Sequence, residues 1–333
     1  MVRITIIVFG LLIISISKGQ NHNGTELDSI VEITYNYFKQ GRCEEAIPLL
    51  KETLKKCSGS SEIHRVTSLM MDCYFATSQY DKMFDILNYG NSKSVVYRFP
   101  AFYLDSLGNN PVFKEILHKN DSVLLIEKAN AKASVEIVLP DNYDRKKEYP
   151  LFIVLTKGSR TKKILIDSYR SNRIKEEFIM AFMHSSDFRG TNFYQWHNEK
   201  ERRPEIVNMY NEVKSKYTID TTRIIIGGMS NCGQMAIDMT FRESLPIIGF
   251  IAFCPTDAKI TDNEILHKSE SKIKGAIVAG KSDRRFLKEA ETMREIMIKN
   301  NFQLIYETGD FGHQIPKDSY LYIDKALNYF FNK

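Results

Sequence analysis

The sequence lacks the closely spaced metal-binding side chains from which common zinc sites are built. Its seven histidines and five cysteines are scattered over 333 residues, with no Cys-x-x-Cys and no His-Glu-x-x-His spacing. Structural and catalytic zinc sites draw most of their ligands from such short spacings. The sequence therefore predicts no metal site and no cofactor.

An excess of charge of one sign is also missing. The 46 Lys and Arg residues and the 41 Asp and Glu residues are interspersed, and the net charge of +5 is small for this length. Proteins that bind nucleic acids gather basic residues into a patch or stripe. We therefore expect no nucleic-acid partner.

Long hydrophobic runs are scarce, and the one at the N-terminus is short. Met1-Val2-Arg3 precedes an apolar run at 4–16, and small residues then occupy the positions that a signal peptidase reads before Gln20. A membrane-spanning helix needs about 20 apolar residues. Residues 1–19 are therefore predicted to be a secretory signal peptide. The mature chain would be exported, to the periplasm or the medium, with no membrane span.

Five cysteines in an exported chain permit disulfides without requiring them. Cys43 and Cys57 fall at opposite ends of one predicted helix, too far apart to bridge. Cys57 with Cys73, across a helical hairpin, is the more plausible pair. The alternative interpretation is that these cysteines are small buried thiols.

Residues 20–120 show helical periodicity throughout. Tyr37–Leu50 is similar to the turn and second helix of a tetratricopeptide hairpin, and a second copy follows at Tyr74–Leu87. Pro48 would kink the second helix of the first copy. Because two hairpins bury little core alone, we expect this helical domain to pack against the next one. Recruitment of a protein partner is the second interpretation.

After residue 120 the pattern changes to alternating strands and helices. Short apolar, β-branched runs predict strands at 123–126, 134–139, 150–155, 178–183, 223–226, 247–253, 275–279 and 302–307. Helices are predicted at 162–171, 201–216, 286–300 and 318–331, and from Ser230 onward. This alternation favours an α/β domain over 121–333 with a doubly wound, mainly parallel sheet. Such sheets place their chemistry at the carboxyl ends of the strands.

The segment Arg223–Ala236 is the centre of this domain. A β-branched run leads through a glycine pair to Ser230 and then into a helix-compatible segment. A sharp strand–turn–helix of this kind presents a serine hydroxyl above the sheet, and it needs small residues around the serine. Gly228 and Gly233 meet this need, whereas Cys232 stands where glycine is more usual. A serine that only caps the helix is the structural alternative.

A nucleophilic serine needs a base, and the base needs an orienting carboxylate. His313 follows the last predicted strand, in a loop that contains glycine. Asp283 follows the strand at 275–279, and Asp257 after the preceding strand is its rival. The order Ser, Asp, His along the chain is that of α/β-hydrolases.

Three further side chains precede the nucleophile strand in a long polar loop. His184, Trp196 and His197 are expected to line the substrate site.

Residues 134–333 resemble the α/β-hydrolase serine esterases, in particular the putative-esterase and phospholipase/carboxylesterase branch. The resemblance is carried by Val135-Glu-Ile-Val-Leu-Pro-Asp-Asn-Tyr143 and by the approach to the serine, Tyr217-Thr-Ile-Asp-Thr-Thr-Arg-Ile-Ile-Ile-Gly-Gly-Met-Ser230. It implies that Ser230 is the nucleophile, Asp283 the acid and His313 the base.

The resemblance also implies an oxyanion hole made of backbone N–H groups. One would come from Asn231, and the other from Ser159 in the loop after an early strand. Family members usually carry His-Gly in that loop, where this chain has Lys157-Gly158. Cys232 is interpreted as a buried filler, because an elbow centred on it would put Gln234 where a small residue is needed.

Together these features predict an exported esterase that cleaves carboxylic esters through an acyl-enzyme. Only about twenty residues separate the strands ending at 253 and beginning at 275, where lipases often insert a lid. We therefore expect an open site for soluble or polymer-attached esters, such as acetyl or feruloyl groups on carbohydrate. Two alternatives stay open: a serine peptidase on the same fold, and a binding or scaffold protein whose hydrolase domain is inactive. Lys157 and Cys232 motivate the second.

Overall fold

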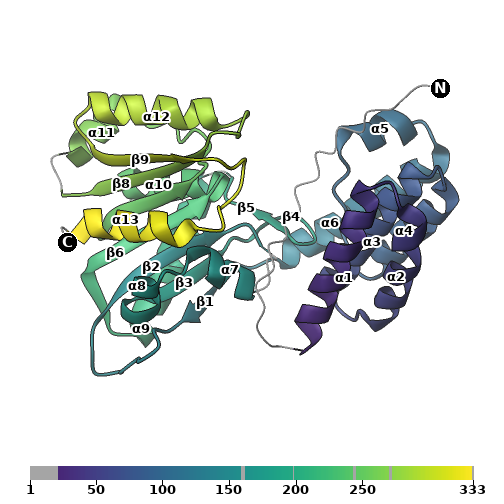
Figure 1. The fold of residues 1–333 in the computed structure, drawn as a ribbon, viewed down its shortest axis with the longest axis horizontal. Coiled ribbons are helices and arrows are strands. Elements are labelled where there is room, and N and C mark those ends of the chain that lie inside the picture. The colour runs from purple at the N-terminus through teal and green to yellow at the C-terminus, as the bar shows by residue number, and fades with distance from the viewer. Residues whose placement is uncertain (1–21, 159–161, 198, 243–244, 270–271, 332–333) are drawn as a thin grey trace.

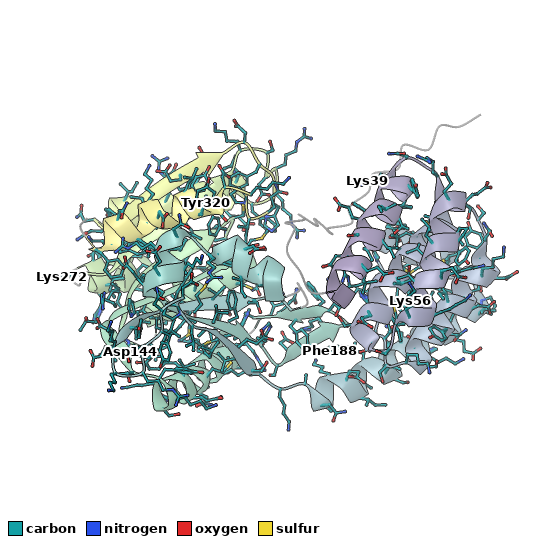
Figure 2. All side chains as sticks on the ribbon, turned by 60° about the horizontal axis from the view of Figure 1, so that its bottom comes forward. Lys39, Lys56, Asp144, Phe188, Lys272 and Tyr320 are labelled. Atoms are coloured by element: carbon teal, nitrogen blue, oxygen red, sulfur yellow. The ribbon has the colours of Figure 1, made fainter. Side chains whose placement is uncertain are left out.

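The computed structural model describes residues 22–158, 162–197, 199–242, 245–269 and 272–331. The predicted signal peptide, residues 1–19, lies outside this part of the chain. The described residues form an N-terminal helical region and a sheet-containing region, each with its own buried apolar core (Figure 1). With all side chains drawn, Phe188 lies between the two regions (Figure 2). No helix in the described ranges is both long and apolar enough to cross a membrane.

The helical region begins with two hairpins that share one turn geometry. In the first turn the N–H of Arg42 donates to the carbonyl oxygen of Tyr37 (2.9 Å), and in the second Gln79 donates to Tyr74 (2.8 Å). The helix that contains Pro48 continues through it. The similarity to tetratricopeptide hairpins stays a prediction. The helices are α1 (His22–Lys39), α2 (Cys43–Lys56), α3 (Ser60–Ala76), α4 (Tyr80–Ser92), α5 (Ala101–Leu107) and α6 (Pro111–Asn130).

The main sheet has the strand order β1-β3-β2-β6-β7-β8-β9. β1 runs antiparallel to β3, and every other neighbouring pair is parallel. This is the doubly wound, mainly parallel sheet predicted from the alternation of elements, and it is of the α/β-hydrolase type that the resemblance implied. The strands are β1 (Ser134–Val138), β2 (Tyr149–Thr156), β3 (Ile179–His184), β6 (Ile219–Met229), β7 (Ile247–Phe253), β8 (Lys274–Gly280) and β9 (Gln303–Gly309).

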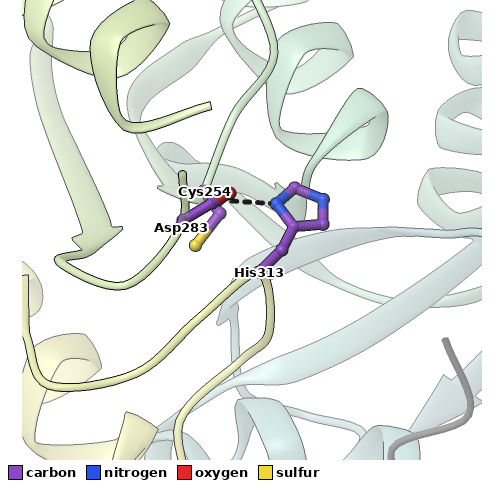
Figure 3. A group of neighbouring side chains, drawn as sticks. All are labelled: Cys254, Asp283 and His313. Carbon is purple, nitrogen blue, oxygen red and sulfur yellow. Dashed lines mark hydrogen bonds and ion pairs between the residues drawn. The ribbon is translucent and has the colours of Figure 1, made fainter. Parts of the chain in front are cut away.

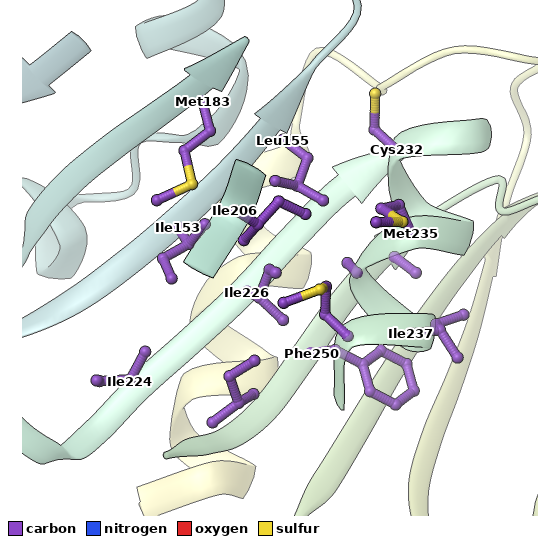
Figure 4. Packing of buried hydrophobic residues seen from close by; sticks show 14 of the residues in the cluster. Ile153, Leu155, Met183, Ile206, Ile224, Ile226, Cys232, Met235, Ile237 and Phe250 are labelled. Atoms are coloured by element: carbon purple, nitrogen blue, oxygen red, sulfur yellow. The ribbon is translucent and has the colours of Figure 1, made fainter. Parts of the chain in front are cut away.

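Helices cover both faces of this sheet, so its central strands are apolar on both sides. In β2, Ile153 and Leu155 pack into one core, where they meet Ile206 and Met235 of the covering helices (Figure 4). Phe152 packs into the core on the opposite face. One face is covered by α9 (Glu199–Lys216), α10 (Asn231–Arg242), α11 (Asp262–Ser269) and α12 (Leu287–Lys299). The other is covered by α7 (Lys162–Tyr169), α8 (Asn172–Glu177) and α13 (Ser319–Phe331).

A small antiparallel ribbon joins the helical region to the sheet region. At its tip the hydroxyl of Thr191 accepts a hydrogen bond from the N–H of Val96 (2.8 Å), and the N–H of Thr191 donates back to Val96 (3.0 Å). At its base the N–H of Tyr194 donates to the carbonyl oxygen of Lys157 (2.9 Å). The ribbon therefore connects the helical region to the loop that follows β2. Its strands are β4 (Asp187–Gly190) and β5 (Phe193–Gln195).

Two expectations from the sequence need correction. The predicted strand at 123–126 is wrong, because these residues continue α6, and the predicted boundary at residue 120 falls inside that helix. Of the two interpretations of the cysteines, the pairing of Cys57 with Cys73 is wrong, because both are free thiols. Because α2 and α3 run antiparallel, the end of α3 lies beside the start of α2, so Cys73 lies near Cys43 and not near Cys57. The thiol of Cys57 instead donates to the carbonyl of Thr53 (3.4 Å).

Candidate active site

Ser230 lies in the turn between β6 and α10 with a left-handed backbone, φ 59°. A non-glycine residue is strained in this conformation and keeps it only where its surroundings enforce it. Here the N–H of Ser230 donates to Phe253 (2.8 Å), and its carbonyl accepts from Gln234 (2.9 Å). The turn is also tight, since a Cβ at Gly228 would lie 2.6 Å from the backbone carbon of Cys232. The local geometry is that of a strand–turn–helix elbow with the serine at its apex.

Three side chains from separate loops are joined in a line by hydrogen bonds. Nε2 of His313 lies 2.9 Å from Oγ of Ser230, and Nδ1 of His313 lies 2.7 Å from Oδ2 of Asp283. His313 comes from the loop after β9 and Asp283 from the loop after β8. When Nδ1 donates its proton to the carboxylate, Nε2 is left as an acceptor facing the serine hydroxyl.

The carboxylate of Asp283 is buried and fixed on both oxygens. Oδ2 contacts His313, while Oδ1 accepts the N–H of Phe286 (3.2 Å). The Phe286 ring also packs against the imidazole, with 4.5 Å between ring centroids. The rival acid, Asp257, is exposed, and its Oδ1 accepts the N–H of Lys259 (2.8 Å). The structure therefore places Asp283 and not Asp257 against the histidine.

Cys254 lies against this acid–base pair, which was not expected from the sequence (Figure 3). Its thiol donates weakly to Gly312 and Gln314 (3.7 Å each). Burial raises the pKa of Cys254 to about 11, so the thiol is uncharged at neutral pH. In the described part of the chain, Cys254, Asp283 and His313 bring three potential metal ligands together. Because Nδ1 of His313 already bonds the carboxylate, the group fits an acid–base pair beside a neutral thiol.

The donors expected for an oxyanion hole are partly visible. Asn231 begins α10, so its N–H belongs to the first turn, where a helix offers no acceptor of its own. Its side-chain oxygen accepts the N–H of Trp196 (2.8 Å), and its Nδ2 is buried without a partner among the described residues. Ser159, the expected second donor, lies outside the described residues. Gly158 just before it has a positive φ of 88°.

The side chain of Lys157 reaches Ser230. Nζ donates to Oγ of Ser230 at 2.9 Å, the same distance that separates Oγ from His313. The sequence alone predicted only a main-chain role for this loop, because the resemblance implied backbone donors there. The serine oxygen therefore has a base on one side and a cation on another.

The three side chains expected to line the site have different surroundings. The indole of Trp196 is fully buried, and Nε1 donates to the carbonyl of Thr156 (3.0 Å), so it braces the end of β2 and does not line an open site. Nδ1 of His184 lies 2.7 Å from Oγ1 of Thr156, and burial lowers the pKa of this histidine. His197 is exposed at the surface.

Cys232, the residue out of place in the elbow motif, is buried in the first turn of α10. It belongs to the core cluster that contains Met235 and Ile226 (Figure 4). In this position it packs against the elbow from the helix side.

Gly275–Ser282 has the spacing Gly-x-x-x-x-Gly-Lys-Ser of a phosphate-binding loop. Such a loop works by turning free backbone N–H groups toward the phosphates. Here Gly275 to Gly280 form most of β8 and pair along their length with β9. The spacing therefore belongs to a buried strand and makes no phosphate loop.

No protein-family model and no curated protein sequence matches the chain. The fold is similar to that of an uncharacterized protein from Bacillus cereus ATCC 10987, with a TM-score of 0.51 and 16% identity over 91% of this chain and 98% of that one. It also has some similarity to esterase PE8 (TM-score 0.48, 16% identity, 60% of this chain and 99% of that one). The Bacillus cereus carboxylesterase is a further neighbour (TM-score 0.45, 15% identity, 62% and 98%). At such identities the first likeness shows the fold alone, over the helical and sheet regions together.

Proposed function

We propose that this protein is a serine hydrolase that cleaves carboxylic esters through an acyl-enzyme. Ser230 is the nucleophile, His313 the general base and Asp283 the orienting acid. The observation that carries the proposal is the pair of hydrogen bonds made by His313, 2.9 Å to the serine oxygen and 2.7 Å to the carboxylate. A serine hydroxyl without such a base is a weak nucleophile.

The reaction follows from these contacts. Nε2 of His313 takes the hydroxyl proton of Ser230 as Oγ bonds to the ester carbonyl carbon. The tetrahedral oxyanion then re-forms the carbonyl and expels the alcohol, which leaves with the proton held on Nε2. Water attacks the resulting acyl-serine by the same path and restores the hydroxyl. Asp283 stays ionised throughout and stabilises the imidazolium.

Export and the substrate are parts of the same proposal. The apolar run at residues 4–16 supports secretion. In its described residues, the short segment between β7 and β8 has the single helix α11, which supports a site open to soluble or polymer-attached esters. Acyl groups on carbohydrate are the substrate class that we propose.

Labelling with a fluorophosphonate probe tests the nucleophile. We expect the full chain to be labelled and Ser230→Ala to lose both labelling and roughly 10⁶-fold in kcat. Ser215→Ala provides the control, because Ser215 is exposed on α9 and bonds only to its own helix. An unlabelled wild-type protein would support the inactive scaffold interpretation.

A substrate panel separates ester from amide cleavage. We expect hydrolysis of p-nitrophenyl acetate and release of acetate or ferulate from substituted glycans, all of it abolished in Ser230→Ala. Cleavage of peptide substrates in preference to these esters would replace the proposal with the peptidase alternative. Activity on p-nitrophenyl acetate with no release from glycans would remove only the carbohydrate part.

A further inference from the structure

The loop after β2 brings a cation to the nucleophile. Nζ of Lys157 donates to Oγ of Ser230 at 2.9 Å. The backbone of this lysine is held in place, because its carbonyl accepts the N–H of Tyr194 (2.9 Å). The next residue, Gly158, has a φ of 88°, and a Cβ there would lie 2.6 Å from the Tyr194 ring. The backbone from which the lysine side chain extends is therefore held by a tight, glycine-dependent turn.

This position is where charge develops during acyl transfer. When Oγ bonds to the carbonyl carbon, the former carbonyl oxygen becomes an anion on that same carbon. A donor already within hydrogen-bond distance of Oγ therefore needs only a small rotation of its flexible side chain to reach the oxyanion. Effective donors lie about 2.7–3.1 Å from the oxyanion.

We propose that the Lys157 ammonium is a catalytic donor to the oxyanion, in addition to the backbone N–H groups expected for this fold. The inference rests on the proposed function and assigns the lysine to its transition state. In the resting enzyme the ammonium donates to the serine oxygen. As Oγ bonds to carbon and its lone pair is used, the ammonium transfers its hydrogen bond to the oxyanion. No proton leaves the lysine in this step.

A charged donor is effective here for two reasons. Hydrogen bonds from an ionised donor are roughly twice as strong as those between neutral groups. Ser230 is also buried, with 4% of its surface exposed, so water does not weaken the interaction as it would at the surface. The chain thus has a lysine where its relatives are expected to rely on main-chain donors.

Steady-state kinetics on p-nitrophenyl acetate test the assignment. Lys157→Met keeps most of the apolar side chain and removes the donor, and it should lower kcat by about 10²–10³-fold, while KM changes less than threefold. Lys157→Arg, which retains a cation, should keep more of the activity. Lys288→Met, at an exposed position on α12, is the matched control and should behave as wild type.

A rescue experiment separates chemistry from support of the loop. In Lys157→Ala, millimolar methylammonium or propylammonium should restore part of kcat, whereas a purely structural role would not respond to an amine. An unchanged kcat in Lys157→Met, or a loss that no amine restores in a folded Lys157→Ala, would overturn the assignment. So would a rise in KM confined to esters that carry a carboxylate. Wild-type protein that no fluorophosphonate labels would instead contradict the proposed function itself.

Discussion

The backbone N–H of Trp196 donates to Oδ1 of Asn231 at 2.8 Å, which ties the end of the ribbon to the residue after Ser230. The same ribbon holds the loop of Lys157 through Tyr194, and its tip bonds Val96 of the helical region. The helical region is therefore connected, through one short structural element, to the loops that carry Lys157 and Ser230. Substitutions at the tip of the ribbon should therefore lower the activity of the site.

Thr191→Val is expected to destabilise this connection. Thr191 is buried, and its hydroxyl accepts the N–H of Val96, which valine would leave without an acceptor. A buried, unsatisfied N–H costs about 1–3 kcal/mol. Urea unfolding should show this loss of stability. Steady-state kinetics on p-nitrophenyl acetate should show a lower kcat. Thr292→Val, on the exposed face of α12, should change the unfolding free energy by less than about 0.5 kcal/mol. Equal stability of the two variants would argue against the ribbon as a support.

Gly228→Ala is expected to disrupt the elbow. The new methyl group would lie 2.6 Å from the backbone carbon of Cys232 and 2.7 Å from its oxygen, and neither backbone atom can move without shifting α10. We expect slower fluorophosphonate labelling and a lower thermal midpoint. Gly59→Ala is the comparison, because a Cβ there meets no atom within 4 Å. Labelling of Gly228→Ala at the wild-type rate would show that the turn tolerates expansion.

Acidification should weaken the contact between α3 and the ribbon. Nδ1 of His64 lies 3.3 Å from the side-chain nitrogen of Asn192, and burial lowers the pKa of His64 to about 4. Between pH 6.5 and 4 the unfolded chain therefore binds a proton that the folded chain does not. The stability contributed by neutral His64 is present above pH 6.5 and is lost as the pH falls through this window.

His64→Gln measures this effect, because glutamine does not titrate. The unfolding free energy of wild type relative to the variant should fall by up to about 3 kcal/mol from pH 7 to pH 4. The unfolding free energy of wild type is compared with that of the variant because a second buried group titrates on the same helix. Burial raises the pKa of Asp72 to about 6, so this group stabilises the folded chain as the pH falls, opposite to His64. His118→Gln, at an exposed position, should show no such trend. A flat difference between wild type and His64→Gln would contradict the prediction.

The sheet and the positions of the loops that carry Ser230, Asp283 and His313 could be predicted from the sequence. Buried parallel strands are short, continuous apolar runs, which are easily recognised. Apolar, β-branched runs such as those of β2 and β6 marked strands, and the residues after them marked loops at one edge. The run at 123–126 misled for the same reason. Its residues have strand-like composition, but Leu125 and Ile126 are 70% and 60% exposed on a helix that Asn110 caps at its start.

The ribbon, the position of the Lys157 side chain and the position of Cys254 could not be predicted, because they depend on contacts between residues far apart in the sequence. The strands of the ribbon are short and lie outside the main sheet, and their partners are Val96 and Lys157. The role inferred for the Lys157 side chain also depends on a contact with a residue 73 positions away. Cys254 beside the acid could have been suspected only from its place directly after β7.

The ribbon also determines when the helical region can gain its contacts with the rest of the chain during synthesis. The hydrogen bond from Val96 to Thr191 cannot form until Thr191 has been synthesised, 95 positions after Val96. At a synthesis rate of about 5–20 residues per second, this interval lasts roughly 5–20 s. For that time the helical region has an unfilled docking edge, and a fragment ending after α6 would keep it permanently. The two regions are consequently poor candidates for exchange as independent modules.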